Sequence, residues 1–160
     1  MRDQRRYESP NIFALRSRTF DATASPLGSG RGGDVHSEHW KLEPDDHDFP
    51  AAAAYLSLIC EPTLANQLVK LLKSAPSTIY QAKDLLRSSD LALLSKENLH
   101  VAKDLAQVKA GHKLSPVLLV RGRFTKGRAL VIADGYHRIC ASYWINENSQ
   151  IPCRIVDVPN

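Results

Sequence analysis

The chain has few cysteines for its 160 residues. It carries three of them, Cys60, Cys140 and Cys153, and no two form a CxxC pair. An odd number of widely spaced cysteines predicts neither a disulfide framework nor a zinc knuckle. Because disulfides persist in oxidising compartments, this cysteine usage favours a reducing, cytoplasmic location.

Long apolar runs and blocks of like charge are also missing. The longest apolar stretches, such as residues 116–120, fall far short of the ~20 residues that a membrane helix needs, which predicts no export signal and no membrane partner. The 21 Lys and Arg residues are spread among 17 acidic ones, for a net charge of +4. Dedicated nucleic-acid binding is therefore only weakly indicated.

Composition divides the chain into three parts. Residues 1–48 are rich in Arg, Ser, Gly, Asp and Pro and have no apolar period, which predicts a flexible leader. Its histidines and aspartates are expected to form a solvated tail, so no metal site is predicted. Residues 49–94 carry leucines at helical spacing on both sides of Pro62, which predicts a helical segment packed on the core. Residues 95–160 are expected to form an α/β module, and a single domain is the default for a chain of this length.

The order of elements expected in the third part is helix, strand, strand, turn, helix and strand. Apolar residues at helical spacing predict a helix over residues 96–110, ended by Gly111. Short β-branched runs predict strands at 116–120, 129–133 and 151–156, with the last helix after Gly135. The fold class expected is α/β (α+β), a small mixed β-sheet with packed helices.

The strand that ends at Asp134 passes directly into this last helix. The unpaired N–H groups at a helix start can bind an anion, and Gly135 lets the chain come close to a phosphate. Arg138 would offer a planar fork of donors, and His137 a further donor or a proton carrier. Each residue also has an ordinary interpretation, since Asp134 is a common helix N-cap and Gly135 a common turn residue.

Three segments together resemble the ParB/sulfiredoxin superfamily. They are PVLLVRG (116–122), LVIADGYHRICASY (130–143) and IPCRIV (151–156). The resemblance covers roughly residues 95–157 and implies that the turn holding Gly135, Tyr136, His137 and Arg138 binds the phosphates of ATP or CTP. Mg²⁺ is expected with such a nucleotide.

The sequence also departs from this family. Sulfiredoxin has its catalytic cysteine where this chain has Tyr136, so sulfinic acid reduction is not expected, and Cys140 is better explained as a small buried residue. Partition proteins of the family have a helix-turn-helix region after the nucleotide module, and the sequence shows none before Asn160. A free-serine kinase of the same fold has a turn similar to residues 134–138, which makes a phosphotransferase conceivable.

The resulting hypothesis is a nucleotide-binding protein, with an ATP- or CTP-dependent hydrolase or phosphotransferase activity left open. Asp134 and His137 are the catalytic candidates. Four further residues are weaker candidates: His112, Lys113 and Ser115 precede the first strand and would flank the nucleotide, and Lys103 would reach a phosphate from the preceding helix.

Two alternatives stay open, and the oligomeric state is not predicted. One is a DNA-binding or nuclease-like protein that contacts the phosphate backbone through Arg121, Arg123 and Arg128. The other is a non-enzymatic interaction module that docks through residues 50–94.

Overall fold

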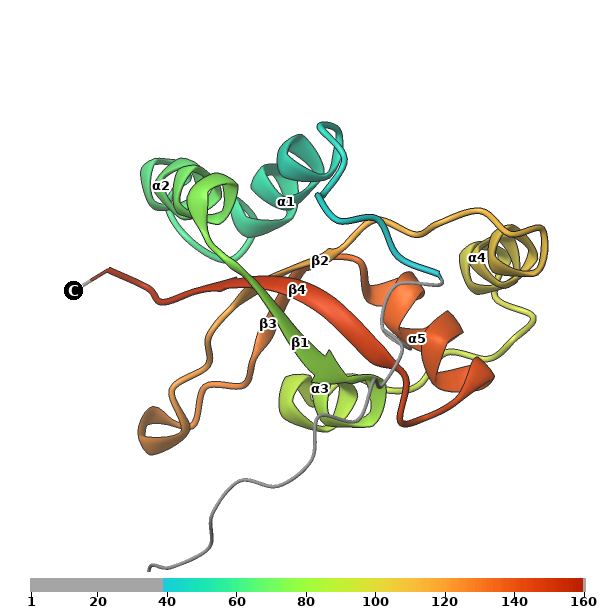
Figure 1. Cartoon of the computed structure of the whole chain (residues 1–160). Helices are drawn as coiled ribbons and strands as arrows, with labels where there is room; N and C mark the ends of the chain where they lie inside the picture. The colour runs from blue at the N-terminus through green and yellow to red at the C-terminus, as the bar shows by residue number, and fades with distance from the viewer. Residues whose placement is uncertain (1–38, 160) are drawn as a thin grey trace, which may run out of the picture. The chain divides into compact units, whose positions relative to one another are not determined.

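A four-stranded sheet joins strands from both halves of the chain (Figure 1). The computed structural model describes residues 39–159, with the side chain of Phe124 excepted. In chain order the elements are α1 (Asp48–Leu56), α2 (Pro62–Ser74), β1 (Ser77–Gln81), α3 (Ala82–Ser89), α4 (Leu99–Lys109), β2 (Val117–Val120), the 3₁₀ turn η1 (Phe124–Lys126), β3 (Val131–Asp134), α5 (Tyr136–Ile145) and β4 (Gln150–Val156).

The strand order across the sheet is β1-β4-β2-β3. β2 runs parallel to β4, whereas β1 is antiparallel to β4 and β3 is antiparallel to β2. The sheet is therefore mixed, and the expected class of a small mixed sheet with packed helices is confirmed. Because parallel strands need a crossover, the chain passes from β3 through α5 before β4 pairs with β2.

The sheet is covered on both faces, which explains why all four residues of β2 are buried. Successive side chains of a strand point to opposite faces. Val117 and Leu119 accordingly pack in one core cluster with residues of α3, α4 and α5, and Leu118 and Val120 pack in a second cluster with residues of α1 and α2. The turn that ends β3 lies where elements from the two faces meet.

Most of the expected elements are present, with one strand that was not predicted. Helices lie on both sides of Pro62 and over Leu99–Lys109, and strands follow at the three expected places. β1, however, lies inside the segment 49–94 that was expected to be helical. It pairs with β4, a partner about 75 residues away in sequence (Thr78 opposite Cys153), and local sequence alone does not reveal such a pairing.

The expected leader, residues 1–48, is described only from residue 39 onward. Trp40 is buried and forms an isolated parallel bridge with Leu114, where the amide of Lys41 donates to the Leu114 carbonyl at 2.8 Å. This short segment runs beside the loop before β2 and leads into α1. In the described part of the chain, no helix combines the length and the apolar composition needed to cross a bilayer.

Burial in the core clusters predicts which leucines stabilise the fold. Leu118 is fully buried, so Leu118→Ala is expected to lower the free energy of unfolding by about 2–5 kcal/mol through lost burial and a cavity. Leu99→Ala removes the same atoms from a residue that is 78% exposed, and is expected to stay within about 0.5 kcal/mol. Urea denaturation measures both, and equal losses would contradict this account of the core.

Candidate functional site

The turn between β3 and α5 depends on a glycine. Gly135 precedes the first residue of α5 with a φ of 100°, in the left-handed region that favours glycine. A Cβ at this position would lie 2.9 Å from a methyl carbon of Val117, so a larger residue would also clash with the buried strand β2. Because glycine has no side chain to cap the helix, the N–H groups at the start of α5 have no side-chain cap.

A polar cleft of about 540 Å³ lies beside this turn. Its walls come from four parts of the chain: the segment from Lys41 to Ala51, helix α4, the loop at 112–115, and the turn itself. The cleft contains lysines, histidines, aspartates and Arg138, so its lining is dense in charged and titratable groups. This is the only place where the structure brings together most of the predicted site residues within the described residues 39–159: Lys103, His112, Lys113, Ser115, Asp134, Gly135, His137 and Arg138.

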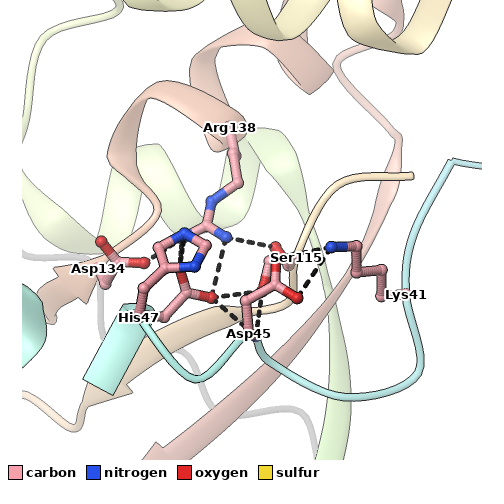
Figure 2. A network of polar contacts seen from close by, with 7 residues as sticks. Lys41, Asp45, His47, Ser115, Asp134 and Arg138 are labelled. Atoms are coloured by element: carbon pink, nitrogen blue, oxygen red, sulfur yellow. Dashed lines mark hydrogen bonds and ion pairs between the residues drawn. The ribbon is translucent and has the colours of Figure 1, made fainter. Parts of the chain in front are cut away.

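Arg138 does not point freely into this cleft. Its NH1 group donates to Asp48 at 3.2 Å and to the Ser115 carbonyl at 3.0 Å, and its NH2 group donates to Asp134 and lies 3.4 Å from Asp48. Figure 2 shows the guanidinium between Asp134 and Ser115. Only 13% of the side chain is exposed. Arg138 therefore ties α1, the loop before β2 and the end of β3 together.

Asp48 is the buried acceptor of this network, with 2% of its surface exposed. The Ser115 hydroxyl donates to its carboxylate, and the amide of Asp45 donates to the Ser115 hydroxyl at 2.9 Å. Burial raises the pKa of Asp48, but the hydrogen bond from Ser115 and the charge of Arg138 outweigh burial, so that its pKa is lowered. Asp48 is ionised whenever the network is intact at neutral pH.

Asp134 is the second carboxylate on Arg138 and titrates differently. Burial raises its pKa to about 6, and the negative charge of Asp48 adds to this rise against the opposing effect of Arg138. Because the pKa of the folded state lies above the ordinary aspartate value, this group contributes stability at low pH that is lost as the pH rises through about 6. Asp134 therefore exchanges a proton near neutral pH, inside the cleft.

Two histidines lie side by side at this cleft, one on α4 and one on α5. The ring centroids of His100 and His137 are 4.7 Å apart. Burial lowers the pKa of His137, and the neighbouring His100 lowers it further. Burial also raises the pKa of Asp104, which lines the same cleft one turn after His100. His137 is therefore mainly neutral at pH 7, when it can donate one hydrogen bond and accept another.

Tyr136 does not line the cleft, although its ring centroid is 5.7 Å from that of His137. Its hydroxyl donates to the Ala92 carbonyl, and its ring packs against the core cluster of α3, α4 and α5. Cys140 is fully buried, and burial raises the pKa of its thiol, which agrees with the expectation of a small core residue.

The three arginines of the DNA hypothesis lie around the β2–β3 connection, and none of them lines the polar cleft. Arg121 Nε is 2.9 Å from Asp157 Oδ1, and Arg123 donates to the Val158 carbonyl at 3.1 Å. DNA binding stays a prediction that these contacts do not test.

Asp48, His100 and Asp104 also line the cleft but were not predicted as site residues. Asp48 was read as part of a solvated leader. The signal for the other two was available, because His100, Lys103, Asp104 and Gln107 are spaced by three or four residues and so form a polar stripe on α4 that lines the cleft.

Comparison with protein-family models, with curated proteins and with solved structures finds no match for this chain. Among residues 39–159, no three His, Cys, Asp or Glu side chains are grouped as a metal ion would require.

The proximity of Asp48 and Asp134 predicts how the titration midpoint of Asp134 responds to substitution. A carbon-detected NMR titration is expected to place the midpoint of Asp134 near pH 6. Asp48→Asn removes the neighbouring negative charge and is expected to lower this midpoint. The control is Asp46→Asn, an exposed aspartate nearby, which should leave the midpoint in place. A midpoint at the ordinary aspartate value in the native chain would contradict the electrostatic account.

Proposed function

We propose that the polar cleft binds the phosphate groups of a nucleotide at the start of α5, and that Asp134 serves as the general base for phosphoryl transfer or hydrolysis. One observation carries this proposal: basic side chains from separate segments converge with an uncapped helix N-terminus around a half-buried carboxyl group whose pKa is about 6. Phosphate binding is also the function that the sequence resemblance implies for the turn at residues 135–138.

The cleft offers several groups that favour a phosphate. Backbone N–H groups at a helix start carry partial positive charge and bind anions. Lys103 on α4 and Lys113 in the loop before β2 both line the cleft, and neither forms an ion pair within the part of the chain that the structure describes. His112 adjoins Lys113 on the same wall. Because these cations belong to different segments, together they can contact a ligand with several phosphate oxygens.

The volume of the cleft, about 540 Å³, lies in the range of ordinary small-molecule sites, roughly 300–1,000 Å³. Its lining is more polar than that of most such sites, which favours a highly charged ligand over an apolar one. ATP and CTP both satisfy this requirement, and Mg²⁺ would arrive with the nucleotide phosphates.

Asp134 is placed to accept a proton in this cleft. A general base works best when its pKa lies near the working pH, and burial brings the pKa of Asp134 to about 6. Arg138 holds one carboxylate oxygen of Asp134, so we assign Arg138 a positioning role. Its terminal N–H groups are occupied by protein acceptors, and the phosphate contacts are assigned to Lys103, Lys113 and the amides of α5.

Binding is tested by calorimetry with Mg-ATP and Mg-CTP on the full chain. The double variant Lys103→Gln/Lys113→Gln is expected to weaken binding roughly tenfold or more, because hydrogen bonds to charged groups contribute about 1.5–3 kcal/mol each. The matched control, Lys70→Gln/Lys109→Gln, removes two exposed lysines that do not line the cleft and should bind as the native chain does. No heat with either nucleotide, or equal weakening in both variants, would overturn the proposed function.

Catalysis is tested by the pH dependence of phosphate release or transfer. The rate is expected to rise with pH and level off above about 6, because Asp134 must be ionised to accept a proton. Asp134→Asn is expected to lower kcat by about 10²–10⁴-fold, while nucleotide affinity changes little. A native rate in this variant, with the same pH profile, would rule out Asp134 as the base.

A further inference from the structure

The structure has a second cleft, which shares no lining residue with the first. Its volume is about 700 Å³, and it lies between α3, the sheet and the connection from β2 to β3, called here the 121–130 hairpin. We propose that this cleft binds an amphipathic anion, a molecule with an elongated apolar body and one carboxylate or similar acidic group. This site is independent of the proposed nucleotide site.

The inner surface of the cleft is apolar and follows the sheet. Leu119 of β2 and Ile155 of β4 are direct neighbours in the parallel register, and Leu85 of α3 and Leu130 of the hairpin close over them. Tyr80 of β1 also lines the cleft, opposite Ile151 in the register. Tyr80 thus lines the cleft at the level of the buried Ile151, four residues or roughly 13 Å along β4 from Ile155, so the lining surface is long enough for an extended chain.

The rim of the cleft carries three arginines from two different elements. Arg87 pairs with Asp84 at 2.8 Å, and Arg121 pairs with Asp157 at 2.9 Å; both arginines are at least half exposed, so these pairs are weak and can exchange partners. Arg128 forms no ion pair with any residue between 39 and 159 in the structure. Asp84 and Asp90 also line the cleft, so its three arginines exceed its carboxylates by one. Arg128, which has no ion pair within the described residues, is therefore the cation that selects for an anionic group.

The hairpin that carries two of these arginines has a defined geometry. A Cβ at Gly122 would overlap the backbone of Arg128 and Ala129, so the two arms of the hairpin pack backbone against backbone. The Leu130 amide donates to the Ser88 carbonyl at 2.9 Å, which anchors the returning arm on α3. The guanidinium of Arg128 is thus attached to a wall that is fixed to the rest of the cleft.

This combination decides the class of ligand. The cleft combines an apolar floor with charged groups at its rim, and in small-molecule sites such polar groups set the orientation of the ligand. A nucleotide would place several phosphates against leucines, and a cationic amphiphile would face the arginines. An elongated monoanion satisfies both surfaces at once, with its apolar body on the sheet and its acidic group at Arg128.

Calorimetry or equilibrium dialysis with three probes of equal chain length tests this inference on the full chain: decanoate, 1-decanol and decylammonium. Decanoate is expected to bind most tightly. Arg128→Gln should weaken decanoate roughly tenfold and leave 1-decanol unchanged. Lys126→Gln, which removes a cation from the same hairpin but not from the cleft, is the matched control. Equal affinity for the three probes, or no effect of Arg128→Gln, would overturn the assignment.

Two further variants locate the ligand. Ser88 is exposed and lines this cleft, but it lines neither the polar cleft nor the neighbouring cleft described below. Ser88→Trp is therefore expected to fill the space and abolish decanoate binding without altering the buried core. A neighbouring cleft shares Arg121 and Arg128 but is lined by Tyr55 on α1. If Tyr55→Ala abolishes binding while Ser88→Trp does not, the ligand sits in that neighbouring cleft and the proposal is wrong. Thermal unfolding confirms that each variant is folded.

Discussion

One guanidinium connects the two layers of helices to the end of the sheet. Arg138 starts on α5, which covers one face, and reaches Asp48 at the first turn of α1, which covers the other. On the way it holds Asp134 and the carbonyl of Ser115. Because a buried charge without a partner is strongly destabilising, each member of this network constrains the others. These contacts hold together the walls of the polar cleft, and the charge of Asp48 adds to the burial that raises the pKa of Asp134.

The network also separates the roles of two chemically identical groups. Asp48 accepts hydrogen bonds from the Ser115 hydroxyl and from Arg138, which favours its charged form. At Asp134 burial is the larger effect and favours the protonated form. Of the two carboxyl groups that contact Arg138, Asp48 therefore remains an anion and Asp134 exchanges its proton. Such a division of pKa values between neighbours is common where proteins carry out acid–base chemistry.

The sequence predicts those features of this arrangement that depend on neighbouring residues, and it does not predict those that depend on residues far apart in the chain. The strand runs at β2 and β3 and the glycine at 135 are local signals, and the structure has them where they were expected. Asp48, the buried partner of Arg138, is 90 residues away in a segment whose composition predicts a solvated tail, and no periodic pattern indicates the contact. The same holds for β1, whose five residues become a strand only because β4 is beside them. Pairings over such distances are decided by tertiary contacts.

The central position of β4 has a consequence for how the chain is assembled. β4 pairs with both β1 and β2, yet of the four strands in the described residues 39–159 it is synthesised after the other three. Until residue 156 has left the ribosome, β1 has no neighbour, and β2 can pair only with β3. The sheet must then be completed by inserting a strand between two others, through contacts that are distant in sequence, which is a slow route to a native fold. During that interval the apolar sides of β1 and β2 are open, so the nascent chain is vulnerable to aggregation until β4 is available to pair with them.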